Sequence, residues 1–319
     1  MAEARDMALP DLRAETVPGR VTAPVQAAGA SLHHIVIVGG GAGGLVLATK
    51  LGRRLGRNKQ VLITLIDASL THVWKPLLHE VAVGTLDSHK DDVLFLSHAK
   101  NHGFRFQQGR MDGLDRARKL VHLAPIVDAD GLEVIARRTM AYDTLVIATG
   151  GICNDFGTPG VKAHDWLREL DGLETNRANQ LVVDTAMRTT RDPDVFAIGD
   201  CAACQLPGQD QPLPPRAQVA YQQAMALAQN LRRRLAGQPL EPFRYKDYGS
   251  LVSLSYSSVG TLMGNLLGDV MIEGRLARLT YQSLYKKHQL AVHGPVWVAL
   301  VSLINILRRG TEPRLKLHL

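Results

Sequence analysis

The chain has 319 residues, 45% of them hydrophobic, and its 37 Lys and Arg against 30 Asp and Glu give a net charge of +7. This size and composition predict one large or two small globular domains with a sizeable core. The positive charge favours a negatively charged partner such as anionic lipid or an acidic ligand. Nucleic acid is not expected as a partner, because the cations are spread along the chain without a recognition motif.

The amino-terminal residues 1–31 are rich in Ala, Pro and Gly and mix acidic with basic side chains. They contain no apolar run, so neither a secretory signal nor a basic transit peptide is expected. We expect this segment to be a disordered leader.

The first predicted element is a short buried strand at 34–38 (HIVIV). The glycine-rich turn after it opens a helix that ends near Gly56, and a second strand follows at 61–66. Between 69 and 143 the pattern is mixed, with short segments separated by Gly and Pro. This beginning is typical of an α/β unit.

Two further buried strands are predicted at 144–148 (TLVIA) and 195–198 (VFAI), with loop-like sequence between them. A helix is predicted over 215–237, because two prolines introduce it and a glycine ends it. Residues 248–280 alternate short strands and glycines, and 284–307 is helical in character. Together these elements predict an α/β fold followed by a carboxy-terminal region.

A glycine-rich motif stands between the first strand and its helix. Gly39, Gly41 and Gly44 of the sequence GGGAGG satisfy the pattern GxGxxG, and Asp67 ends the next strand. Glycines let the backbone turn tightly and approach a pyrophosphate at the positive end of the helix. Asp67 is suited to accept hydrogen bonds from the ribose hydroxyls. The alternative is a glycine-rich turn without function, but the complete strand, turn, helix and acid favour a dinucleotide site.

Two later segments favour FAD over NAD. Residues 142–151 (YDTLVIATGG) resemble the ATG motif of FAD-binding flavoproteins with two dinucleotide-binding domains, and 190–200 (TRDPDVFAIGD) resemble their last FAD motif. The resemblance implies that Asp200 holds the ribityl chain. The helix after Pro215 can point its N–H groups at the pyrimidine end of the flavin and stabilise negative charge there. The alternative is that both segments are only core strands that end in glycine turns.

Further segments resemble the type II NADH:quinone oxidoreductases, and the resemblance runs from about residue 33 to the end. The segments are VWKPLLHEVAVG at 73–84, NDFGTPGV at 154–161, GLETNRANQLVV at 172–183, GDCAAC at 199–204, AQVAYQQA at 217–224 and IEGRLA at 272–277. The family reaction is electron transfer from NADH through FAD to quinone in the respiratory chain. Sulfide:quinone oxidoreductases are a related alternative that these segments favour less.

The resemblance implies a set of binding residues, with no catalytic side chain and no metal ligand among them. The residues implied for FAD are Gly39, Gly41, Ala42, Gly44, Asp67, Lys75, Thr149, Gly150, Asp200, Ala217 and Gln218. Those implied for quinone are Gln218, Tyr221 and Gln222. The alternative for the two glutamines is an exposed polar helix face.

One departure from the family concerns NADH. Relatives carry a second Rossmann unit, with its own GxGxxG, between the segments that correspond to 154–161 and 172–183. Only residues 162–171 lie between them here, so roughly a hundred residues of such a unit are missing. Gly160, Val161 and Lys162 look like a fused junction left by an in-frame deletion, natural or engineered. NADH activity is therefore expected to be low or nil, because hydride transfer requires the nicotinamide to be held against the flavin.

We accordingly expect a FAD-binding Rossmann-like fold with the second, NAD(P)-binding domain deleted. Its first half is expected at 32–163 and its second half at 164–245, followed by a carboxy-terminal region at 246–319. Two hypotheses remain: an oxidoreductase that passes electrons from FAD to quinone, and a noncatalytic flavin-binding remnant that acts through partners. A homodimer is a further partner that the sequence allows.

The three cysteines, Cys153, Cys201 and Cys204, cannot form a disulfide framework and are typical of a reducing compartment. Cys201 and Cys204 form a single CxxC, which lacks the second pair that a structural zinc site needs. It also lies far from the first FAD helix, where disulfide reductases of this class hold their redox dithiol. We expect neither a metal nor a redox role.

The carboxy-terminal segment 295–307 (PVWVALVSLINIL) is continuously apolar over too few residues to cross a bilayer. Ser302, Asn305 and Arg309 fall on a narrow polar stripe at helical spacing, opposite Trp297 and the other apolar residues. This pattern predicts a helix that lies in the membrane interface, and hence a peripheral membrane protein on the cytoplasmic face. The alternative is a core or dimer-interface helix.

Overall fold

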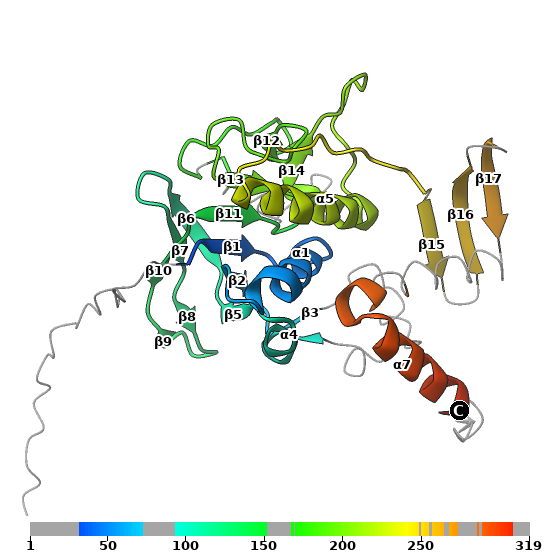
Figure 1. Ribbon diagram of the computed structural model, residues 1–319, viewed down its shortest axis with the longest axis horizontal. Coiled ribbons are helices and arrows are strands. Elements are labelled where there is room, and N and C mark those ends of the chain that lie inside the picture. The colour runs from blue at the N-terminus through cyan, green and yellow to red at the C-terminus, as the bar shows by residue number, and fades with distance from the viewer. Residues whose placement is uncertain are drawn as a thin grey trace, which may run out of the picture. The chain divides into compact units, whose positions relative to one another are not determined.

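The structure is a computed structural model, which describes residues 32–72, 93–151, 167–168, 170–248, 250–254, 257–264, 268–273, 286 and 289–308. Figure 1 shows the elements that these residues form. In chain order they are β1 (His34–Val38), α1 (Gly44–Leu51), the π-helix η1 (Gly52–Gly56), β2 (Leu62–Asp67), β3 (Thr71–His72), β4 (Val93–Leu94), α4 (Phe95–His102), β5 (Arg105–Gln108), β6 (Met111–Asp115), β7 (Leu120–Leu123), β8 (Ile126–Val127), β9 (Glu133–Ile135), β10 (Arg138–Ala141), β11 (Thr144–Ile147), β12 (Leu181–Val183), β13 (Val195–Ala197), the 3-10 helix η3 (Gly199–Cys201), β14 (Ala202–Cys204), α5 (Ala217–Leu235), β15 (Ser250–Leu254), β16 (Ser257–Gly264), β17 (Gly268–Glu273) and α7 (Pro295–Arg308).

A parallel sheet of five strands in the order β13-β11-β1-β2-β5 forms the centre of the fold. The middle strand β1 is paired on both sides, so that Val36 lies between Leu145 of β11 and Thr64 of β2. Its sequence HIVIV is apolar on both faces, as a strand covered from two sides requires. The predicted α/β fold with a parallel sheet is therefore confirmed.

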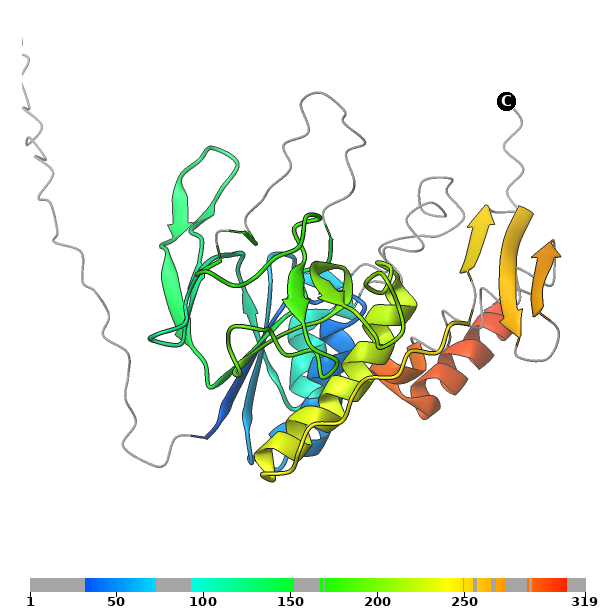
Figure 2. The same ribbon diagram turned by 90° about the horizontal axis from the view of Figure 1, so that it is seen from above.

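Helices α1 and α5 pack against each other on one side of this sheet, and the antiparallel sheet β10-β7-β6 lies on the other side (Figures 1 and 2). Helix α5 buries an apolar stripe that includes Ala224, Leu227 and Leu231, at the three- and four-residue spacing of one helical face. Its last turn carries Arg232, Arg233 and Arg234, whose charges suit the negative end of the helix dipole.

The strands and helices predicted from the sequence are present with small shifts at their ends. The helix expected over 215–237 is α5, the four buried strands are β1, β2, β11 and β13, and the strands expected over 248–280 are β15, β16 and β17. The helical carboxy-terminal segment contains α7. Within the described residues no helix is both long and apolar enough to cross a membrane. The leader 1–31, Lys75 and the junction Gly160–Lys162 lie outside the described residues.

Candidate functional site

A cavity of about 950 Å³ lies where all five parallel strands end. Each strand leads into a segment that lines it: β1 into 38–43, β2 into 66–69, β5 into 109–112, β11 into 148–150 and β13 into 198–200. Ligands of open α/β sheets bind at this carboxyl edge, where the chain turns away from the sheet. Ala217 and Ala220 at the start of α5 complete the lining.

The glycine motif has three steric roles in the structure. Gly39 has a φ of +104°, and a Cβ on it would overlap the carbonyl of Ala148 in the neighbouring strand. A Cβ on Gly44 would overlap the carbonyl oxygen of Gly39, so only glycine lets α1 start this close to β1. By contrast, Gly41 has no atom within 4 Å of a Cβ position. It therefore keeps space free on the cavity side of the loop.

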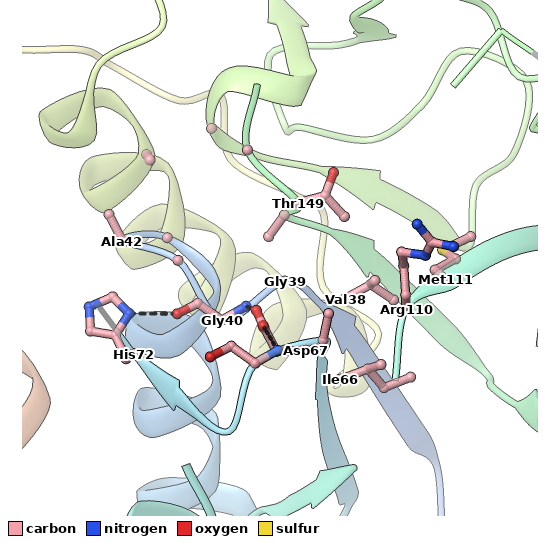
Figure 3. Close-up of a pocket in the computed structure, with 18 of the residues that line it drawn as sticks. Val38, Gly39, Gly40, Ala42, Ile66, Asp67, His72, Arg110, Met111 and Thr149 are labelled. Atoms are coloured by element: carbon pink, nitrogen blue, oxygen red, sulfur yellow. Dashed lines mark hydrogen bonds between the residues drawn. The ribbon is translucent and has the colours of Figure 1, made fainter. Parts of the chain in front are cut away.

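The carboxylate of Asp67 is held by two backbone N–H groups. Its Oδ2 accepts a hydrogen bond from Gly40 at 2.6 Å, and its Oδ1 accepts one from Ser69 at 2.8 Å. Figure 3 shows Asp67 beside the glycine loop, on the wall that β2 forms. Asp67, which the sequence predicts to bind the ribose hydroxyls, thus also fixes the conformation of the glycine loop.

His72 holds the same loop from its other side, and sequence reasoning did not assign it to the site. Its Nδ1 donates to the carbonyl oxygen of Gly40 at 2.8 Å, and its ring is buried (Figure 3). Phe95 lies below the loop, where a Cβ on Gly40 would meet its ring. Gly40 is therefore fixed through its N–H, its carbonyl and its van der Waals contact.

Residues 109–112 are a second part of the cavity that sequence reasoning missed. Gly109 donates its N–H to the carbonyl of Asp67 at 2.8 Å, which brings Arg110 and Met111 to the cavity wall (Figure 3). The available signal was their position after a strand of the parallel sheet. That strand, β5, has the sequence RFQQ and was not recognisable as buried.

The other end of the cavity contains four more of the residues implied for FAD, whereas Gln218, also implied for FAD, does not line it. Thr149, Gly150, Asp200 and Ala217 all line it, and Gly150 has a φ of +75° that favours glycine. The N-terminal end of α5 faces the cavity here, and the first N–H groups of a helix have no partner within it. This end can accept a group that gains negative charge.

Gln223 positions the turn that precedes Asp200, which the sequence did not reveal. It is only 1% exposed, and its Oε1 accepts the N–H of Gly199 at 2.7 Å. Gln180 reaches the same turn and donates to the carbonyl of Asp200 at 2.9 Å. Two amides from separate segments therefore hold Asp200 at the cavity.

The residues implied for quinone do not line this cavity. Gln218 donates to Asp247 at 2.9 Å, and Gln222 donates to the carbonyl of Lys246 at 2.8 Å. Both glutamines also accept N–H groups of this segment, from Tyr248 and Lys246. Tyr221 is half-buried, and burial, followed by the neighbouring Tyr248, raises the pKa of its phenol. In the structure the two glutamines bind the segment 246–248 to α5.

Cys201 and Cys204 are buried, and burial raises the pKa of each thiol to about 11. Cys201 Sγ lies 3.3 Å from the carbonyl oxygen of Ile198 and 3.4 Å from that of Ile147. Thiols with such pKa values are almost entirely protonated at neutral pH and react slowly, because the thiolate is the nucleophile.

Comparison with known proteins identifies the family. The model of the pyridine nucleotide-disulphide oxidoreductases matches residues 33–171 and 162–224. Over 445 aligned positions the chain is 30% identical to a type II NADH:quinone oxidoreductase of Haemophilus influenzae, covering 90% of this chain and 100% of that protein. This chain belongs to the type II NADH:quinone oxidoreductase family. A family member from Staphylococcus aureus is 43% identical over 107 residues, which are 33% of this chain and 26% of that protein.

Solved structures show the same fold. NDH2 from Plasmodium falciparum, in complex with NADH, superposes with a TM-score of 0.61 at 12% identity over 83% of this chain and 99% of that one. The sulfide:quinone oxidoreductase of Aquifex aeolicus gives a TM-score of 0.60 at 15% identity, over 90% of this chain and 96% of that one. The resemblance seen in the sequence is thereby confirmed.

The family consists of FAD-binding flavoproteins, and the cavity fits this cofactor. The open space at Gly41 lies at the positive end of α1, where a pyrophosphate binds in dinucleotide folds. Asp67 lies at one end of the lining, and Asp200 with the start of α5 lies at the other. FAD is therefore the cofactor that these residues are suited to hold.

Proposed function

We propose that this chain binds FAD in the cavity at the carboxyl edge of the sheet and passes electrons to a quinone at a membrane surface. The observation that carries the proposal is the glycine loop, whose only open position faces this cavity. When bound, the flavin supplies reversible two-electron chemistry. The chain binds the pyrophosphate at 39–44, positions Asp67 and Asp200 for the ribose and ribityl hydroxyls, and directs the α5 dipole at the isoalloxazine.

We also propose that the chain lacks the unit that binds NADH in its relatives. The alignment with the Haemophilus influenzae protein has 445 positions, whereas the whole chain has 319 residues, so at least 126 positions lack a counterpart here. The two matches to the family model overlap at 162–171, where the sequence suggests a junction. Reduction by NADH should then be slow, because the unit that would hold the nicotinamide against the flavin is proposed to be missing. The halves of the FAD domain are proposed at 32–163 and 164–245.

Attachment to the cytoplasmic face of a membrane through α7, in the region 246–319, is a further part of the proposal. Val296 is 81% and Leu300 is 57% exposed, and Trp297, Leu303 and Ile304 are also exposed. Val298 is buried and Ser302 is half-buried, so these two residues lie on the protein side of the helix. A helix with an exposed apolar face suits the bilayer interface. A homodimer is the other arrangement that could cover this face.

Quinone is proposed to bind near Gln218, Tyr221 and Gln222, because these positions match the family segment AQxxxQxA. Their hydrogen bonds to 246–248 support a positioning role, in which the glutamines hold a segment beside the start of α5. The phenol of Tyr221, with its raised pKa, stays protonated and able to donate a hydrogen bond. Replacing Tyr221 by Phe tests whether this phenol donates a hydrogen bond to quinone, and Tyr248→Phe is the matched control.

An absorbance experiment tests the function and separates it from the noncatalytic alternative. Purified protein should carry the visible flavin bands, lose them with dithionite under anaerobic conditions, and regain them when a soluble quinone is added. NADH should bleach the flavin far more slowly than dithionite. Bleached protein that quinone cannot reoxidise would identify a noncatalytic flavin-binding remnant. Folded protein that is colourless and takes up no FAD would refute the proposal.

A further inference from the structure

Segments without acidic residues lie next to one another around the start of α7. The segments 44–60 and 95–103 contain no Asp or Glu, and neither does 289–308. The segments 44–60 and 95–103 carry six cations that we call the basic face: Lys50, Arg53, Arg54, Arg57, Lys59 and Lys100. Among the described residues, none of the six has a carboxylate within ion-pair distance.

In the rest of the described chain some of the cations form ion pairs. Eight cations outside this face have an acidic partner: Arg116, Arg118, Lys119, Arg137, Arg188, Arg216, Arg233 and Arg234. On the basic face the cations instead repel one another. The pKa of Lys50 is lowered by burial and then by Arg54 and Arg53. The fold therefore maintains positive charge here without compensation.

Contacts in the structure join this face to the segment that leads into α7. Arg53 Nη2 donates to the carbonyl of Val292 at 2.8 Å, and the ring of His98 meets that of His293 edge-on at 5.7 Å. His293 in turn stacks on Trp297, with ring centroids 4.0 Å apart. Arg57 donates to the carbonyl of Asn101, which ties η1 to α4. Elements α1, η1, α4 and the start of α7 thus form one connected surface.

Apolar and basic groups occur together on this surface. Most described apolar side chains of α7 are exposed, and Leu96 of α4, four residues before Lys100 on the same helix, is 63% exposed. Arg54, Lys59 and Lys100 are exposed, and no hydrogen bond of their side chains is recorded within the described residues. Exposed apolar residues next to unpaired cations suit an anionic bilayer, in which the apolar groups enter the interface and the cations meet headgroups.

We propose that the basic face of the FAD domain binds anionic phospholipid, and that this face sets the lipid preference of the protein. The inference rests on the proposed attachment through α7 and adds to it a second contact, from residues 50–59 and Lys100. Nucleic acid, the other polyanion, would not use the exposed apolar side chains of α7 and Leu96.

The test is vesicle co-sedimentation of the full flavin-loaded protein, with vesicles of phosphatidylcholine alone and of phosphatidylcholine mixed with phosphatidylglycerol. The wild type should prefer the mixed vesicles, and more so at low salt. The variant R54Q/K59Q/K100Q should lose about 100-fold in partitioning to the mixed vesicles, at about fivefold per cation. The matched control R118Q/R137Q/R188Q removes the same charge from exposed, paired cations and should bind like the wild type.

The outcomes separate this inference from the proposed attachment. If the wild type binds neither kind of vesicle, both the proposed membrane attachment and the proposed lipid binding by the basic face are refuted. Equal binding to both vesicles, unchanged in R54Q/K59Q/K100Q, would leave attachment standing and overturn the basic face. An equal loss of vesicle binding in both triple variants would also refute lipid binding by the basic face, since net charge alone would then explain binding. The same conclusion would follow if R54Q/K59Q/K100Q lost DNA binding in a gel shift but kept its vesicle binding.

Discussion

The two ends of helix α1 meet different requirements. At its first residue, Gly44 approaches Gly39 so closely that no side chain fits. At its other end, η1 carries Arg53 and Arg54 and is followed by Arg57, with no acid in the same segment. Close packing makes the first end sensitive to one methyl group. The second end depends on a sum of charges, so that each single residue contributes little. We call the glycine loop 39–44 and the turns that carry Asp67 and Asp200 the cradle. Single mutations should therefore abolish FAD binding by the cradle abruptly, whereas lipid binding by the basic face should weaken gradually.

The largest effect is expected at Gly44. In Gly44→Ala the added methyl overlaps the carbonyl oxygen of Gly39, and the obstacle is backbone that cannot rotate away. We expect a loss of about 3 kcal/mol or more in stability and protein that purifies without flavin. Thermal unfolding and the visible absorbance of the purified variant measure the two effects.

Gly41→Ala is the matched control within the same loop. Nothing lies within 4 Å of the new Cβ, so the stability of the FAD-free protein should stay within about 0.5 kcal/mol of the wild type. The affinity for FAD should nevertheless fall at least tenfold, or about 1.4 kcal/mol, because the cofactor's pyrophosphate must approach this position. Unchanged FAD affinity would show that the cofactor does not pass Gly41.

The contact between His98 of α4 and His293, just before α7, predicts that the stability of the protein depends on pH. Burial, followed by His102, His293 and Arg53, lowers the pKa of His98 to about 3, and that of His293 is lowered to about 4. Both side chains stay neutral in the folded protein but take up a proton in the unfolded chain below pH 6.5. Their contribution to stability is therefore full above pH 6.5 and is lost as the pH falls toward 4.

For His98 alone the loss between pH 7.5 and pH 5 is roughly 2 kcal/mol. Urea unfolding at both pH values measures it. In His98→Gln, which can still bond to Thr49, the difference between the two pH values should shrink by that amount. A His98→Gln variant with the full pH dependence would show that this ring does not resist protonation.

A smaller effect on the cradle is expected from Gln223→Leu. The N–H of Gly199 would lose its acceptor in a buried place, at a cost of about 1 to 3 kcal/mol. Because the same turn carries Asp200, the affinity for FAD should fall as well. Gln229→Leu, at an exposed position of the same helix, is the control and should change neither quantity. Calorimetric titration with FAD and thermal unfolding distinguish the variants.

The sequence predicted the parts of the cradle whose signal is local. The run HIVIV, the pattern GxGxxG and Asp67 adjoin each other along the chain or lie one helix apart, and each has a steric or electrostatic reason to be there. The partners His72 and Gln223 were missed because their role depends on which backbone group they meet after folding. In the sequence AQVAYQQA the buried Gln223 looks the same as the half-buried Gln218 and Gln222 that precede it.

Two further misses show where periodicity gives too little information. Strand β5, with the sequence RFQQ, has one paired edge in the parallel sheet and carries polar residues, so it lacks the apolar run of β1. Helix α4 begins without a capping side chain at Leu94 and has only eight residues. Its place is set by tertiary contacts rather than by its own sequence, because Phe95 stacks on Phe106 of β5 and His98 bonds to Thr49 of α1. The basic face, built partly on α4, was therefore invisible before the structure.

The smallest effect is expected at the cysteines, and it tests whether the cradle uses sulfur chemistry. With pKa values raised to about 11 by burial, the thiols of Cys201 and Cys204 should react with a disulfide reagent only when the protein unfolds. The double variant Cys201→Ala/Cys204→Ala should keep its flavin spectrum and its rate of reoxidation by quinone, with a loss of stability of about 1 to 2 kcal/mol from the lost packing. Cys153→Ser removes the remaining thiol, so that labelling in that background reports the buried pair alone. Rapid labelling of the folded protein, or a slower reaction with quinone in the double variant, would assign these thiols a part in electron transfer and bring the site closer to that of the sulfide:quinone oxidoreductases.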